Sequence, residues 1–194
     1  MNKLIIVSVL LTIAVFQTNA FAQQSKTRIS LEIDPATFVF SGYSAHIRVQ
    51  PSNTQHVLVG AGVYAMQLPD LIVDLNPKNQ GKGWTSKIKL GYGLFGEYYF
   101  DEVNQSWFVG GQVSLQDYQI TNIENDSEAN FTNFLLMAYG GYVWKPFQKS
   151  PFYLKPWAGV GYTTKISGGA RINEKEYDIA PITMFVTLHL GYTF

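Results

Sequence analysis

The feature that most constrains the fold of this chain is an alternation of polar and apolar residues along stretches of roughly ten residues. In the stretch 183–194, Thr183, His189 and Thr193 share one face, and the opposite face is apolar. That apolar face consists of Met184, Val186, Leu188, Leu190, Tyr192 and Phe194. A side-chain period of two predicts β-strands with one apolar and one polar face.

No apolar run after residue 22 approaches the roughly 20 residues that a membrane-spanning helix needs. A chain that crosses a membrane without such a helix must form a closed barrel, because lipid cannot hydrogen-bond the open edge of a sheet. The pattern therefore predicts an all-β barrel, either in a membrane or soluble and lipocalin-like. The low charged content (14%), the aromatic content (15%) and the 17 glycines favour the membrane barrel.

The first 22 residues have the organisation of a secretory signal peptide. Lys3 supplies the positive start, residues 4–16 are apolar, and Ala20-Phe21-Ala22 has the small residues of a cleavage site. The apolar run is too short for a spanning helix, which disfavours a retained anchor. We therefore predict a cleaved signal peptide over residues 1–22 and a single barrel domain over residues 23–194.

Charge and cysteine content exclude several function classes. Without Lys3, 13 basic side chains face 14 acidic ones, a formal charge of −1 that does not attract nucleic acid. The chain has no cysteine, which excludes a thiol nucleophile, a cysteine metal site and a lipid-modified N-terminal cysteine. No nucleotide, phosphate or zinc motif is present, so we predict no cofactor and no metal.

Turns divide the chain into a regular series of strands. The predicted strands lie near residues 27–34, 37–50, 56–66, 86–100, 107–120, 131–145, 152–166 and 180–194. Short connections (51–55, 101–106 and 146–151) alternate with long polar ones (67–85, 121–130 and 167–178). Bacterial outer-membrane barrels show this rhythm, with short periplasmic turns and longer extracellular loops.

We therefore predict a closed antiparallel transmembrane β-barrel of eight strands in an up-and-down meander. It would be an integral, monomeric protein of the bacterial outer membrane, surrounded by outer-membrane lipids, with its N- and C-termini in the periplasm. Aromatic residues concentrate near the short turns, as in a periplasmic girdle. The first strand, Thr27 to Asp34, is barely long enough to span, but an even strand number requires it. It would turn tightly at Asp34-Pro35-Ala36.

The leader and the sequence Gly191-Tyr192-Thr193-Phe194 together resemble the small outer-membrane barrels of the OmpA, OmpX and OmpW groups. In that class the C-terminal aromatic serves as an assembly signal, so the resemblance implies that Tyr192 and Phe194 contact the barrel-assembly machinery. OmpW-like members imply a route for a small apolar ligand, and OmpX-like members imply surface adhesion. No residue here selects between these two roles.

An eight-stranded barrel has an interior that side chains can just fill, or that holds one small ligand. The alternation places a set of polar side chains inside it. This set comprises His46, Arg48, Lys87, Lys89, Glu97, Gln112, Gln116, Lys155 and His189. Because buried charges need partners, we expect a network around Glu97 with Arg48 or a lysine. Such a network could be a filling plug or a binding or gating site.

Two smaller features suggest more specific chemistry. His46 and His189 should lie at similar depth roughly 10 Å apart, too far to share a metal ion. Ser44 and His46 share a face, which superficially resembles a nucleophile and its base and leaves a lipid A-modifying enzyme as a third hypothesis. Our first hypothesis is a non-enzymatic envelope-structural or surface-interaction protein with a polar plug. A narrow carrier for a small apolar ligand is the second.

One long loop has a helical pattern. Leu68, Leu71, Ile72 and Leu75 follow i, i+3, i+4, i+7 spacing, which predicts a short amphipathic helix. Pro69 suits its first turn, and Asn76-Pro77 would end it. The helix could cover the mouth of the barrel or lie on the outer leaflet.

Overall fold

The computed structural model describes residues 26–147 and 150–194. The signal peptide predicted over residues 1–22 lies outside this range. Within the described part, no helix has the length and apolar character needed to cross a bilayer.

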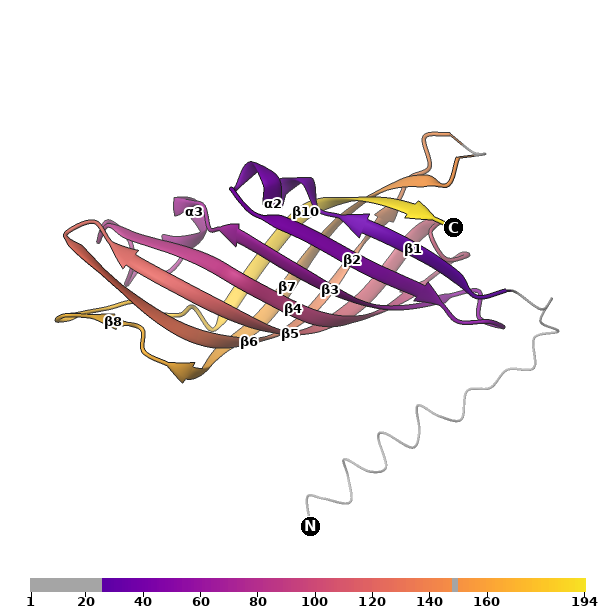
Figure 1. Ribbon diagram of the computed structural model, residues 1–194. Coiled ribbons are helices and arrows are strands. Elements are labelled where there is room, and N and C mark those ends of the chain that lie inside the picture. Colours follow the sequence, from indigo (N-terminus) through magenta and orange to yellow (C-terminus); the bar gives the residue numbers. More distant parts are fainter. Residues whose placement is uncertain (1–25, 148–149) are drawn as a thin grey trace, which may run out of the picture.

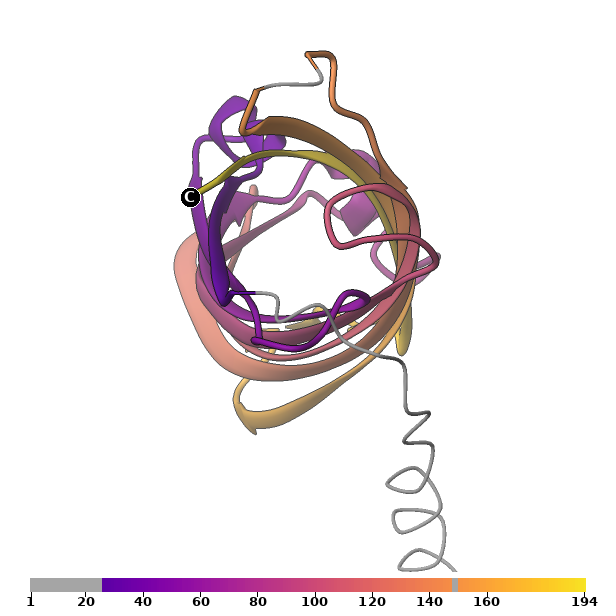
Figure 2. The ribbon, with the colours of Figure 1, turned by 90° about the vertical axis from the view of Figure 1, so that its right-hand side faces the viewer.

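Eight strands form a closed antiparallel barrel (Figures 1 and 2). They are β1 (Arg28–Ile33), β2 (Tyr43–Gln50), β3 (Val57–Gln67), β4 (Trp84–Tyr99), β5 (Ser106–Asn122), β6 (Asn125–Val143), β7 (Phe152–Gly168) and β10 (Ile182–Thr193). Each strand pairs with its neighbours in sequence, and β1 pairs with β10 to close the ring. The predicted eight-stranded meander is confirmed.

The predicted short first strand is present, as β1. The register of β1 runs from Arg28↔Gln50 to Glu32↔His46 on one side, and from Ser30↔Thr193 to Ile33↔Leu190 on the other. Phe194 N donates to Ile29 O (2.8 Å), so both ends of the described chain reach the same end of the barrel. We call it the short-turn end, because β2 ends and β3 begins there, as do β4 and β5, and β6 and β7. The opposite end is the long-loop end.

The predicted tight turn at Asp34-Pro35-Ala36, with a strand from residue 37, is wrong. A short helix, α2 (Pro35–Val39), follows β1, and β2 begins only at Tyr43. Pro35 has no N–H for a strand ladder but suits the first turn of a helix. Asp34 caps that helix by accepting a hydrogen bond from Ala36 N (2.9 Å).

The predicted loop over residues 121–130 is also wrong, because most of it is strand. β5 continues to Asn122, β6 begins at Asn125, and Thr121 pairs with Glu128. In the predicted loop 167–178, two short strands, β8 (Arg171–Ile172) and β9 (Lys175–Glu176), form a separate hairpin. The loop between β3 and β4 contains α3 (Asp70–Val73).

A β-bulge in β4 reverses the faces of its first half. The pairings of β4 with both β3 and β5 shift between Ile88 and Leu90, which means that β4 holds one extra residue there. Since side chains alternate, one extra residue exchanges the two faces. Ile88 is therefore buried, whereas Lys87 and Lys89 are exposed on the outside. The prediction that these two lysines face the lumen is wrong.

Two apolar clusters occupy the two ends of the interior. The cluster at the short-turn end contains Leu58, Phe95, Tyr99, Val103, Phe108, Leu135, Met137, Tyr139, Val143 and Tyr153. The cluster at the long-loop end contains Leu68, Val73, Trp84, Ile88, Tyr118, Ile120, Phe131, Ala170, Ile172 and Tyr177. Polar side chains lie next to the first cluster and between the two.

The bulge leads to a direct prediction about stability. Ile88 is 1% exposed. Ile88→Ala should lower the free energy of unfolding by about 2–5 kcal/mol, as for other large-to-small core substitutions. Lys87→Ala, one residue away on the outer face, should change it by less than about 0.5 kcal/mol. Urea titration of the folded protein measures both, and a larger effect at Lys87 would refute the inward register of Ile88.

Candidate functional site: a charged layer inside the barrel

Two carboxylates and two cations from four different strands meet inside the barrel. Lys155 Nζ lies 3.1 Å from Glu32 Oε1 and 2.7 Å from Glu97 Oε2. Arg48 bridges the same pair, with Nε 3.2 Å from Glu32 Oε2 and Nη1 3.2 Å from Glu97 Oε1. All four side chains are almost completely buried. The layer is balanced in charge and ties β1, β2, β4 and β7 together.

Tyrosine hydroxyls and one histidine complete the coordination of both carboxylates. Tyr153 donates to Glu32 Oε1 (2.8 Å), and His189 Nδ1 lies 2.9 Å from Glu32 Oε2. Tyr139 donates to Glu97 Oε1 (2.8 Å), and Tyr99 donates to Glu97 Oε2 (2.9 Å). Buried charges are tolerated when they are paired and their remaining lone pairs are hydrogen-bonded. Both conditions hold here.

The structure places the sequence-predicted polar residues in two groups. His46, Arg48, Glu97, Lys155 and His189 come together in or beside the charged layer. Gln112 and Gln116 are buried further along β5, toward the long-loop end. Gln112 Nε2 donates to Ser114 Oγ (2.6 Å) and Gln116 Nε2 to the Tyr64 hydroxyl (2.8 Å). Lys87 and Lys89 lie outside, as described above.

Sequence reasoning missed Glu32, which contacts Arg48, Lys155, His189 and Tyr153. The signal was present, because outward-facing Ile29, Leu31 and Ile33 leave Glu32 pointing inward. The tyrosines that donate to the carboxylates were also missed. Nothing in the alternation distinguishes an inward tyrosine that serves a carboxylate from one that fills space.

The two histidines lie closer together than predicted. The ring centroids of His46 and His189 are 4.8 Å apart, instead of roughly 10 Å, although β1 separates their strands. The wall of a small barrel is strongly curved, so inward side chains from alternate strands converge. Among the described residues, no group of three His, Cys, Asp or Glu side chains is arranged to hold a metal ion.

Ser44 does not pair with His46 as a nucleophile would pair with its base. Asp34 N donates to Ser44 Oγ (2.6 Å), and the Ser44 hydroxyl lies 3.3 Å from Asp34 O. The hydroxyl therefore fixes the start of α2 to β2. Within the described residues, no hydrogen bond joins Ser44 to a histidine.

A cavity of about 70 Å³ lies beside the charged layer. Its lining includes His46, His189, Trp157 and Phe185. This volume holds a few water molecules and is far below the roughly 300–1,000 Å³ of ordinary ligand sites. His46 Nδ1 and Trp157 Nε1 are buried atoms without a hydrogen-bond partner.

The predicted amphipathic stripe in the loop after β3 is wrong. Leu68 and Val73 are buried and Ile72 is partly buried, but Leu71 and Leu75 are exposed. α3 is a single turn, and Leu68 N donates to Ser86 O (2.8 Å), so the sheet rather than a helix orients Leu68. The loop packs into the apolar cluster at the long-loop end.

A solvent-exposed ion pair between Lys78 and Asp178 holds the segment after the β8–β9 hairpin at the long-loop end. Lys78 Nζ donates to Asp178 Oδ2 (2.6 Å), and Asp178 N donates to Asn79 Oδ1 (2.9 Å). The hydrogen bond from Lys78 lowers the pKa of Asp178 below its usual value, and Asp178 raises the pKa of Lys78. This contact connects the β3–β4 loop to the segment after β9.

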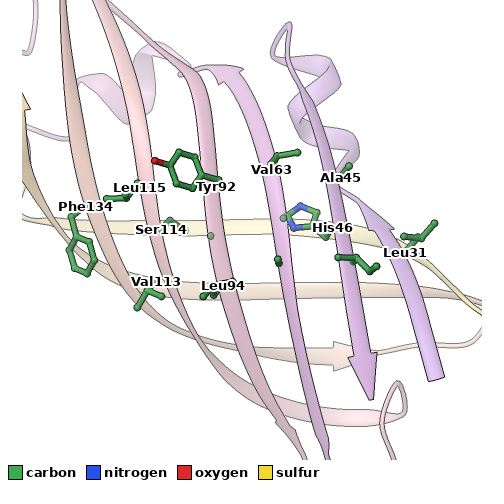
Figure 3. A pocket seen from close by; sticks show the side chains of 14 residues that line it. Leu31, Ala45, His46, Val63, Tyr92, Leu94, Val113, Ser114, Leu115 and Phe134 are labelled. Atoms are coloured by element: carbon green, nitrogen blue, oxygen red, sulfur yellow. The ribbon is translucent and has the colours of Figure 1, made fainter. Parts of the chain in front are cut away.

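The outer wall carries an apolar groove of about 620 Å³ (Figure 3). Outward-facing Leu31, Val63, Tyr92 and Leu94 line it. Gly62 forms part of its floor, and a Cβ there would lie only 2.2 Å from His46 Nδ1 on the inner side. The wall is therefore thin at this point.

Comparisons with solved structures find a structural likeness. No protein family and no curated protein matches the chain. The chain is similar to the crystal structure of the N-terminal β-barrel domain of OprF from Pseudomonas aeruginosa. The identity is 15% and the TM-score 0.44, over 89% of this chain and 100% of that domain.

Removal of one charge from the layer should be costly. Lys155→Met leaves both carboxylates short of a partner and should lower the free energy of unfolding by about 3–5 kcal/mol. Combining it with Glu97→Gln should cost clearly less than the sum of the two single changes, because the residues are coupled. Lys165→Met, an exposed lysine on the same strand, is the matched control. Additive costs in urea titrations would contradict the coupling.

Proposed function

We propose that this protein is an integral β-barrel of the bacterial outer membrane. A signal peptide over residues 1–22 would direct its export and then be cleaved. The observation that carries the proposal is the outer face of the closed barrel, which carries large exposed apolar side chains on every strand. Large exposed apolar side chains include Ile29, Leu31, Ile47, Val59, Val63, Leu94, Val109, Val113, Leu136, Val160, Val186 and Leu190. A surface of this kind suits lipid rather than water.

The dimensions of the barrel support the same proposal. Tyr192 pairs with Phe152 near the short-turn end, and Ile182 pairs with Tyr162 ten residues further along. Ten residues of a strand tilted by roughly 40° rise about 25 Å, which equals the apolar band of outer-membrane barrels.

Aromatic side chains support an orientation with the short-turn end in the periplasm. The exposed aromatics near this end are Tyr98, Phe100, Trp107, Tyr142, Trp144, Phe147, Phe152 and Phe194. Such residues anchor barrels at the membrane–water interface. Both termini would then be periplasmic, and the β8–β9 hairpin and the α3 loop would face outward from the cell.

We propose a non-enzymatic role in envelope structure or surface interaction. The charge-balanced layer and the small adjoining cavity support a lumen plugged by side chains, unsuited to the passage of solutes. A second candidate, a narrow carrier for an apolar ligand, is favoured by one observation, the incomplete pairing of β10 described below.

One set of experiments tests both the outer-membrane location and the plugged lumen. Expressed with its leader, the protein should fractionate with outer membranes and migrate differently on gels with and without boiling. Reconstituted in planar bilayers, it should conduct no more ions than a protein-free bilayer. A soluble periplasmic product with the same mobility in both gels would refute the membrane location, and a stable ion-conducting pore would refute the plug.

We further propose that Tyr192 and Phe194 engage the barrel-assembly machinery. Phe194→Ala should reduce the amount of folded barrel in outer membranes several-fold, measured by the heat-dependent gel shift. Phe147→Ala is the control, because Phe147 and Phe194 are each 70% exposed aromatics near the short-turn end. Equal losses in the two variants would show that only interfacial anchoring is at stake.

A further inference from the structure

Strand β10 continues far beyond the end of its partner β1. Their pairing stops at Ile33↔Leu190, while β10 extends back to Ile182 and stays paired with β7 throughout. Since Phe194 N bonds to Ile29 O and backbone groups alternate sides, the even-numbered residues of β10 face the β1 side. Met184, Val186 and Leu188 therefore point their N–H and C=O groups past the end of β1.

Helix α2 occupies the place of the missing strand. β10 and β2 flank β1, so the slot above Ile33 is about two strand spacings, or roughly 10 Å, wide. A helix of roughly 10 Å diameter fits that width but uses its own backbone groups internally. In the described chain, the hydrogen bond that joins this segment to β10 is from Thr187 Oγ1 to Asp34 Oδ1 (2.8 Å). None reaches the backbone of Met184, Val186 or Leu188.

This open edge lies at the depth of the proposed apolar band. Val186 pairs with Ala158, midway between the pairs Ile182↔Tyr162 and Tyr192↔Phe152 described above. Its side chain is 83% exposed. In lipid, unpaired backbone is tolerated only where protein or a polar group covers it. The seam between α2 and β10 is thus the weakest part of the barrel wall.

The internal cavity lies directly behind this seam. Asp34, Thr37 and Phe185, which flank the seam, also line the cavity, together with Trp157. Apolar clusters fill the barrel toward both ends, so the seam is the most direct route to the cavity. Trp157 Nε1 is a buried donor without a partner, and Arg48 and Lys155 lie on the same lining.

We propose that the α2–β10 seam opens to the outer leaflet and admits a free fatty acid. Its carboxylate would accept hydrogen bonds from Trp157 Nε1 and the open β10 backbone, and its alkyl chain would remain in the bilayer. The cavity admits a head group of this size but not a second chain. This inference rests on the proposed membrane location and favours the carrier over a purely structural barrel.

The absence of native cysteine allows a reversible test. Asp34→Cys with Thr187→Cys places a disulfide across the seam, where the native side chains are hydrogen-bonded. Replacing Trp84, Trp107 and Trp144 by Phe leaves Trp157 as the only indole. In dioleoyl phosphatidylcholine vesicles, 2-bromostearic acid, whose bromine lies next to the carboxylate, should quench Trp157 saturably in the reduced protein. Oxidation should weaken the apparent affinity at least five-fold. Unsaturable quenching, or equal affinity in both states, would overturn the proposal.

Controls separate this inference from the proposed function. Heat-modifiable migration and vesicle insertion are measured first, and their failure refutes the membrane location instead. A protein that keeps only Trp107, on the lipid face, should show quenching that is unsaturable and insensitive to oxidation. If dibrominated phosphatidylcholine quenches Trp157 as strongly as the free acid, bilayer lipid is the occupant and the fatty acid assignment is wrong.

If the disulfide variant does not fold, Thr187→Val is used instead, because it removes the hydrogen bond to Asp34 across the seam. The fatty acid should then associate with the protein at least two-fold faster. An unchanged rate would overturn the proposal.

Discussion

The structure depends on the neutralisation of two carboxylates inside a barrel too narrow to hydrate them. Glu32 and Glu97 share Lys155 and Arg48, so neither cation belongs to one carboxylate alone. Four strands must therefore be in correct register before any of these charges is fully paired. A one-residue slip of β1 or β4 would turn a buried carboxylate toward the outer face of the barrel. The layer thus stabilises one closure of the barrel against its alternatives.

Pro35 sets the second constraint, because it ends the strand that closes the barrel. β1 is six residues long, while β4 to β7 are each more than twice that length. The barrel wall is therefore complete at the level of the charged layer. On the side of the long-loop end it is incomplete, because α2 follows β1 there in place of a longer strand. Ser44, Asp34 and Gly42 all serve this junction. A Cβ on Gly42 would lie 1.8 Å from Ala65 O, so no other residue fits there without displacement of β3.

The sequence predicts the strands well because alternation is a local signal that packing preserves. It fails where a single extra residue changes the phase. Lys87 and Lys89 fit the same alternation of polar and apolar residues as the stretch after them. The sequence pattern therefore gives no sign of the bulge at Ile88–Leu90. It also fails for 119–122 and 125–130, which are mostly polar apart from buried Ile120 and are held by cross-strand pairs. The helix predicted from Leu68 to Leu75 forms only as the single turn α3, which is too short to place all four apolar residues on one face.

The charged layer and the seam are physically connected. Glu32 Oε2 lies 2.9 Å from His189 Nδ1, and His189 Nε2 lies 4.0 Å from Asp34 Oδ2. Asp34 in turn caps α2 and accepts the hydrogen bond from Thr187. A displacement of α2 therefore reaches Glu32 through His189. Sequence reasoning separates His189 as a lumen residue from Asp34 as a turn residue. The fold places both at the boundary between the closed and the incomplete parts of the wall.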